Sequence, residues 1–292
     1  MPSGAVSAAR PLGVRGALAQ VGALSRGELF AGLSVLGFAN GAFDRAYDSV
    51  QADGLAAALF ATFGISVLVW LAFAAAPTLL LRERAPATGR DGLIAVAVLA
   101  AILLPGAPFS WLALTALAGY MLLDRSDAGG EPASSPVRRA AWILLALSGT
   151  MLWGRLLLMG AGGPVLGADA VLIGWLSGTA QSGNTVQFAD GSGFVWIAPG
   201  CSSLSNVSLA MLCWVLLAQW RNVPWSPRTI GWCGLACLAA IAVNVTRISL
   251  MVRYPEHFDL IHGPTGAGIA SVVSLLAVVG VSAWGTGHAP RR

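Results

Sequence analysis

Long apolar segments separated by short polar connections fill most of this chain. A helix that crosses a bilayer needs about 20 apolar residues, and most of these segments approach that length. The segments cover residues 29–43, 55–81, 92–104, 108–123, 139–159, 202–220, 229–251 and 266–284. The pattern predicts an all-α membrane protein with about eight transmembrane helices.

The third and fourth apolar segments are shorter than a bilayer requires, and Pro105-Gly106-Ala107-Pro108 separates them by very little. Because glycine and proline mark helix ends, we expect a tight helical hairpin that reaches the far interface only marginally. Whether both segments cross fully stays open at this point.

One long stretch, about 160–200, interrupts the apolar pattern. Residues 165–176 are too short to span and include Trp175, which favours a short helix along the membrane interface. Residues 185–197 place β-branched and aromatic side chains on both sides of Asp190-Gly191-Ser192-Gly193, which predicts a β-hairpin. Exposed backbone cannot lie in lipid, so we expect both pieces on the outer side.

Arginine placement predicts the orientation, because cytoplasmic loops accumulate positive residues. With the N-terminus inside, residues 1–28 and 285–292 are cytoplasmic tails, and thirteen of the 17 basic residues fall in cytoplasmic segments. These thirteen are Arg10, Arg15, Arg26, Arg82, Arg84, Arg90, Arg125, Arg138, Arg139, Arg221, Arg228, Arg291 and Arg292. The stretch 160–200 and the loop before the last helix then lie outside.

Composition agrees with a membrane protein. The chain has 292 residues, of which 56% are hydrophobic and 10% charged, and its mean hydropathy is +0.73. The net charge of +4 is spread thinly between apolar segments, so no basic face for nucleic acid is expected.

Four cysteines occur, and three of them, Cys213, Cys233 and Cys237, fall inside apolar helices where a thiol behaves as a small hydrophobe. Cys233 and Cys237 share a helix face, but no histidine or carboxylate nearby completes a metal site. We expect neither a metal nor an organic cofactor. Only Cys201 has a polar setting, at the start of the helix 202–220.

Cys201, Arg247 and His262 are the candidate catalytic residues, all on the predicted outer side. A helix N-terminus favours the thiolate form of Cys201. Arg247 is expected to bind an oxyanion or a substrate carboxylate, with backbone N–H groups near Ser202. His262 is expected to move the proton, and His257 is the competing base.

Each of these residues also has an ordinary structural interpretation. Cys201 could be a small buried residue, Arg247 could extend its charge to the interface, and His262 could be a plain loop histidine. Ser202 offers a rhomboid-like serine nucleophile, but no supporting serine motif surrounds it.

Four further residues are expected to bind substrate or support the site: Asn244, Ser202, Ser205 and Arg253. Cys201 and Ser205 recur at helical spacing, and Asn244 lies three residues before Arg247, so they could line one interior face. The alternative is that serine and asparagine side chains only link helices by hydrogen bonds.

These residues resemble the exosortase/archaeosortase family of membrane cysteine transpeptidases. The matching motifs are Cys201-Ser202-Ser203-Leu204, Asn244-Val245-Thr246-Arg247-Ile248 and His262-Gly263, and the resemblance covers residues 139–284. Ser203 stands where the family usually has glycine, and Ser205 where exosortases often have arginine.

The resemblance implies that residues 139–284 form the catalytic core. Residues 29–138 match the family only in being apolar, and their hydropathy predicts N-terminal transmembrane helices. The resemblance also implies exported protein substrates with a C-terminal motif, a transmembrane helix and a basic tail. Such a substrate would be cleaved through a thioester on Cys201 and passed to a lipid or surface acceptor, at the outer face of a bacterial inner membrane. The alternatives are a protease that releases its product to water and a non-catalytic transporter or assembly protein.

Overall fold

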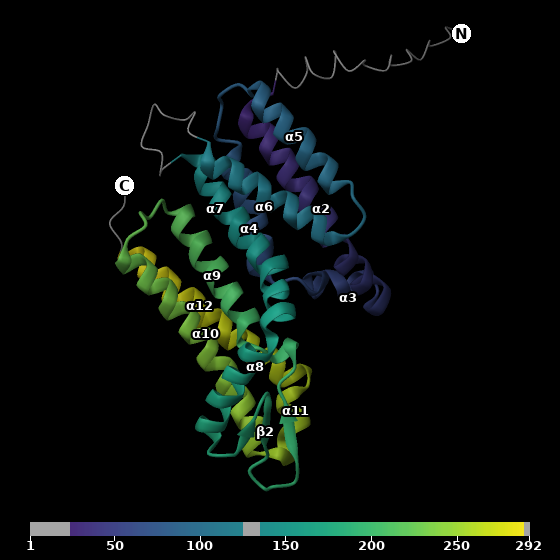
Figure 1. The fold of residues 1–292 in the computed structure, drawn as a ribbon, viewed down its shortest axis with the longest axis vertical. Coiled ribbons are helices and arrows are strands. Elements are labelled where there is room, and N and C mark those ends of the chain that lie inside the picture. Colours follow the sequence, from purple (N-terminus) through teal and green to yellow (C-terminus); the bar gives the residue numbers. More distant parts are fainter. Residues whose placement is uncertain (1–23, 125–134, 289–292) are drawn as a thin grey trace, which may run out of the picture.

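The computed structural model describes residues 24–124 and 135–288, and it is mostly helical (Figure 1). The helices are α2 (Arg26–Asp53), α3 (Leu55–Phe60), α4 (Val67–Leu80), α5 (Gly89–Ile102), α6 (Ala107–Leu123), α7 (Pro136–Ser148), α8 (Gly154–Ser177), α9 (Ser203–Trp220), α10 (Pro227–Arg253), α11 (Phe258–His262) and α12 (Pro264–Gly287). Most of the predicted N-terminal tail and the last four residues of the predicted C-terminal tail lie outside the described residues. Arg10, Arg15, Arg125, Arg291 and Arg292 lie there too.

Four stretches of the chain are long and apolar enough to cross a membrane, among the residues that the structure describes. They are Pro136–Ser177, Ser203–Trp220, Pro227–Arg253 and Pro264–Gly287. The all-α membrane class is therefore supported, but the predicted number of eight spans is wrong by this measure. Helices α4, α5 and α6 have only 14, 14 and 17 residues, and α2 carries six charged residues along its length.

The predicted segment 55–81 is not one helix. It divides into α3, a 3-10 turn η1 (Thr62–Gly64) and α4, because Thr62, Phe63 and Gly64 all have positive φ. Ser66 then caps α4 by accepting a hydrogen bond from the backbone N–H of Leu68 at 3.3 Å. This break leaves space beside the start of α4.

The N-terminal helices pack around one core and share a buried ionic cluster. Arg26 is 3% exposed and pairs through Nε with Asp91 at 3.1 Å and through Nη2 with Asp124. Burial acts to raise the pKa of Asp91, but hydrogen bonds from Thr88 and Tyr120 and the charge of Arg26 together hold that pKa below its ordinary value. Helix α2 thus begins inside the predicted tail, and the ion pairs of Arg26 connect its first turn to α5 and to the end of α6.

The predicted interfacial helix at 165–176 is not separate. It is the second half of α8, which follows α7 through the π-helical turn η3 (Gly149–Trp153). The expected interruption survives only as a kink at Ala161, with φ −129° and ψ 24°, three residues before Pro164. Proline removes one helical hydrogen bond and clashes with the preceding turn, which can bend a helix or end it. Here α8 bends and continues to Ser177.

The predicted hairpin at 185–197 is confirmed. Strands β2 (Thr185–Gln187) and β3 (Phe194–Trp196) pair antiparallel, and β1 (Gln181–Ser182) adds a third short strand on the other side of β2. Asp190 closes the turn by accepting hydrogen bonds from the N–H and hydroxyl of Ser192, which lower the pKa of its carboxyl. The sheet lies beside α8 and α11 at the lower end of the molecule (Figure 1).

Candidate functional site

Cys201 lies just before α9 rather than inside its first turn. The hairpin leads through the buried Ile197 into a 3-10 turn, η4 (Pro199–Cys201), and Ser202 is the N-cap of α9. The Cys201 carbonyl accepts a hydrogen bond from Asn244 Nδ2 at 2.8 Å, and the same amide donates to Ser203 Oγ at 3.1 Å. Asn244 on α10 therefore holds the carbonyl of the residue before the N-cap and the side chain of the residue after it.

The backbone N–H groups around Cys201 already have acceptors. Those of Cys201 and Ser202 donate to the carbonyls of Ala198 and Pro199, and that of Leu204 donates to Ser202 Oγ. The N–H groups near Ser202, which the sequence predicts beside an oxyanion, are therefore hydrogen-bonded within the tight turn, within the N-cap and to Asp169. Any oxyanion donor has to come from elsewhere or from a rearranged turn.

Asp169 is a supporting residue that the sequence reasoning missed. It is 5% exposed, and its Oδ2 accepts hydrogen bonds from Ser202 Oγ at 3.1 Å and from the Ser203 N–H at 2.9 Å. A carboxylate at a helix N-terminus also stabilises the helix dipole. The signal was available, since Asp169 is the single acidic residue in the apolar run 165–176.

Cys201 and His262 line one cavity of about 150 Å³, although 61 residues separate them in sequence. The His262 ring stacks on Phe258 with centroids 5.2 Å apart and planes 9° apart, and Phe258 meets Phe188 edge-on at 6.0 Å. The rest of the wall is apolar and comes from the hairpin and α10: Phe194, Val195, Trp196, Ile197, Ile248 and Met251. The cavity is therefore an aromatic-walled space that offers a thiol and an imidazole.

Arg247 does not line this cavity. Its Nε donates to the Ile261 carbonyl at 3.3 Å, and a terminal nitrogen donates to the His262 carbonyl at 3.1 Å. The guanidinium is thus held against the C-terminal end of α11, where a cation is favourable. Arg247 links α10 to the backbone that carries His262, whereas its expected contact with an oxyanion stays a prediction.

The remaining predicted residues lie in three other places. Ser202 is buried as the N-cap, and Arg253 donates to the Ser177 carbonyl at 3.3 Å, which joins the ends of α10 and α8. His257 is exposed in the 3-10 turn η5 (Pro255–His257) and is not among the cavity residues. Ser205 faces a different cavity from Cys201, so the predicted common face of these two residues is not formed.

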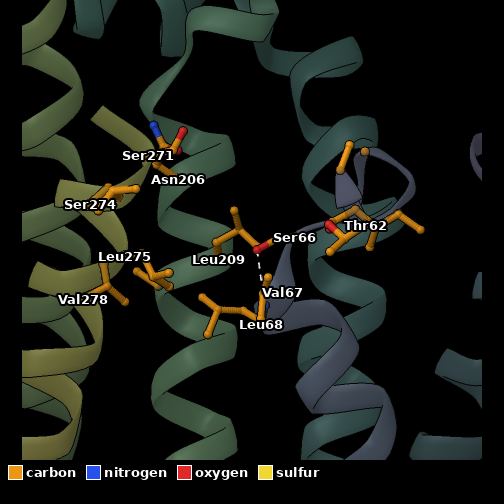
Figure 2. A pocket seen from close by; sticks show the side chains of 15 residues that line it. Thr62, Ser66, Val67, Leu68, Asn206, Leu209, Ser271, Ser274, Leu275 and Val278 are labelled. Carbon is orange, nitrogen blue, oxygen red and sulfur yellow. Dashed lines mark hydrogen bonds between the residues drawn. The ribbon is translucent and has the colours of Figure 1, made fainter. Parts of the chain in front are cut away.

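Two larger cavities adjoin each other beside the break between α3 and α4. The larger, of about 460 Å³, lies between the start of α4, α9 and α12 (Figure 2). The second, of about 230 Å³, is the one that Ser205 lines. The two share Gly64, Ser66 and Leu209 as wall residues.

Comparison of the chain with protein-family models, with curated proteins and with solved structures finds no match. The chemistry that the site can perform follows from its residues. A thiol and an imidazole on one apolar cavity are the parts needed for covalent acyl transfer.

Proposed function

We propose that this protein is a membrane cysteine transpeptidase that cleaves C-terminal sorting signals of exported proteins and transfers them to a surface acceptor. The observation that carries the proposal is the shared cavity of Cys201 and His262. The site belongs, in this proposal, to the outer face of a bacterial inner membrane. No sequence pattern other than the resemblance of residues 139–284 suggests the substrate.

The reaction has two acyl-transfer steps. The Cys201 thiolate attacks the scissile carbonyl, and the imidazolium of His262 gives its proton to the leaving amine, which leaves a thioester on Cys201. An acceptor amine then attacks the thioester, and His262 takes the proton from that amine as the thiolate departs. Arg247 acts in this scheme by positioning His262, since its two hydrogen bonds hold the carbonyls of residues 261 and 262.

Strand β3 supports an extended peptide as the substrate. It pairs only with β2 among the described residues, so its outer edge is available, and it runs directly into the turn that carries Cys201. An extended peptide can add to such an edge through main-chain hydrogen bonds. Trp196 is 60% exposed and Phe194 65% exposed, and both line the cavity, so they are placed to contact substrate side chains.

Two alternatives make different predictions. A protease would release its product with a free carboxyl group, whereas a transpeptidase attaches the product to an amine, so mass spectrometry of the new C-terminus distinguishes them. A non-catalytic transporter or assembly protein would need neither Cys201 nor His262.

The test is replacement of Cys201 by alanine in the native organism. We expect processing of exported proteins that end in a transmembrane helix and a basic tail to fall by about a thousandfold or more, because the nucleophile is lost. Proteomic detection of uncleaved C-terminal peptides measures this. The control is Cys237→Ala, which removes a thiol of α10 that does not line the Cys201 cavity. Substrates should be processed normally by this variant. Normal processing by a stably inserted Cys201→Ala protein would refute the proposal.

A further inference from the structure

The smaller of the two adjoining cavities contains two arginines. Arg45 of α2 and Arg155 of α8 both line it, together with the hydroxyl residues Ser66, Thr150, Ser205 and Ser208. These residues come from four different parts of the chain, so only the folded bundle brings them together. The hydroxyls of Thr150 and Ser208 already donate to backbone carbonyls. The two guanidinium groups, with the hydroxyls of Ser66 and Ser205, are therefore the donors left for phosphate oxygens.

In the described part of the chain, no hydrogen bond or ion pair joins Arg45 or Arg155 to another residue. Asp48 lies one turn further along α2 but makes no ion pair with Arg45. An anionic ligand in this cavity would supply hydrogen-bond acceptors for these guanidinium groups.

The adjoining larger cavity distinguishes a lipid from a free anion. Its wall is mainly aliphatic, with Leu68, Leu209, Leu275 and Val278, and Figure 2 shows these side chains below the polar pair Asn206 and Ser271. Because the two cavities share wall residues, a phosphate in the smaller one has an apolar space of about 460 Å³ beside it. A phospholipid offers both groups in that arrangement.

The depth of the arginines agrees with a lipid headgroup. Helix α9 has 18 residues, which corresponds to about 27 Å and nearly matches the ~30 Å hydrocarbon layer. Ser205 and Ser208 lie in its first two turns, so the arginine cavity lies near one face of that layer, where lipid phosphates are found.

We infer that Arg45 and Arg155 form a binding site for the phosphate of an anionic phospholipid, with an acyl chain in the adjoining cavity. The lipid site does not require catalysis at Cys201. The two sites are neighbours because Cys201 directly precedes α9 and Ser205, in the first turn of α9, lines the lipid site. The lipid site would fix one lipid molecule beside the candidate active site.

The experiment measures binding to the full-length protein in a neutral detergent. Native mass spectrometry with phosphatidylglycerol should show a bound lipid, and each of Arg45→Gln and Arg155→Gln should weaken binding by about tenfold or more, because a charge-assisted hydrogen-bonded contact is lost. Diacylglycerol, which has the chains but no phosphate, should not bind. Arg90→Gln, at an exposed arginine outside both cavities, is the matched control.

A second variant separates the lipid from a free anion. Leu275→Trp, at a partly exposed position of the larger cavity, should weaken phosphatidylglycerol but leave the binding of inorganic phosphate, measured by calorimetry, unchanged. The inference would be overturned if the double glutamine variant bound the lipid with the same affinity as the unchanged protein. It would also be overturned if the unchanged protein bound inorganic phosphate as tightly as phosphatidylglycerol. Cys201→Ala should bind the lipid normally, so failure of the proposed catalysis would not affect this result. If the glutamine variants unfold, Arg45→Lys combined with Arg155→Lys keeps the charge and should still bind phosphatidylglycerol in preference to diacylglycerol. Equal binding of these two lipids by the lysine variant would also overturn the inference.

Discussion

Helix α2 carries one arginine at its first residue, Arg26, and another in its last third, Arg45, and the two have opposite surroundings. Arg26 is buried and contacts the carboxylates of Asp91 and Asp124. Arg45, nineteen residues further on and therefore about 28 Å away along the helix, shares a cavity with Arg155 and pairs with no described carboxylate. The guanidinium of Arg26 has carboxylate partners within the fold, whereas that of Arg45 has N–H donors available to a ligand or to solvent.

The physical reason for the difference is the cost of burying charge. A guanidinium removed from water needs its own counter-ions, since an unpaired buried charge costs several kcal/mol. A guanidinium on a cavity at the edge of the membrane can keep contact with water or with a lipid headgroup. Replacement of Arg26 should therefore lower the free energy of unfolding, and replacement of Arg45 and Arg155 should weaken the binding of the anionic phospholipid.

The largest stability effect is expected at the buried cluster. Arg26→Gln should lower the free energy of unfolding by about 3–5 kcal/mol, because it leaves two carboxylates without their cation. Thermal unfolding of the detergent-solubilised protein measures the loss. A change below 1 kcal/mol would show that water or other groups compensate these carboxylates.

An intermediate effect is expected at Asp169, where a buried carboxylate has only neutral partners. Asp169→Ala should cost about 1–3 kcal/mol, since the Ser202 hydroxyl and the Ser203 N–H lose their acceptor. Asp169→Asn retains an acceptor oxygen and serves as the control, with a smaller loss. Equal unfolding temperatures for the alanine and asparagine variants would indicate that these hydrogen bonds contribute little.

The smallest effect is expected at Arg45 and Arg155, which have no hydrogen-bond or ion-pair partner among the described residues. Arg45→Gln combined with Arg155→Gln should change the stability of the lipid-free protein by no more than about 0.5 kcal/mol. The same thermal unfolding assay, run beside Arg26→Gln, checks this. A loss as large as that of Arg26→Gln would mean that the pair is structural and would remove the contrast between the two ends of α2.

The hairpin illustrates what local patterns predict well. Asp190-Gly191-Ser192-Gly193 predicts the turn because glycine adopts positive φ and aspartate accepts from the backbone two residues on, and Gly191 has φ +74°. The break at residues 62–64 was missed. The run 55–81 is uncharged and apolar on average despite Thr62, Gly64 and Ser66, and hydropathy does not report backbone dihedral angles. The number of spans was overestimated for the same reason: apolar character indicates burial, but not whether lipid or protein covers the helix.

The sequence by itself determined the membrane class, the hairpin, and the three motifs that hold Cys201, Asn244 with Arg247, and His262, because these depend on composition and on neighbours along the chain. Only the tertiary structure decided which of those side chains meet. It places Cys201 and His262 on one cavity, directs Arg247 to the backbone of α11, and places Arg45 and Arg155, 110 positions apart in sequence, on another cavity. Such contacts depend on how helices kink and pack against one another, and no local pattern in the chain encodes them.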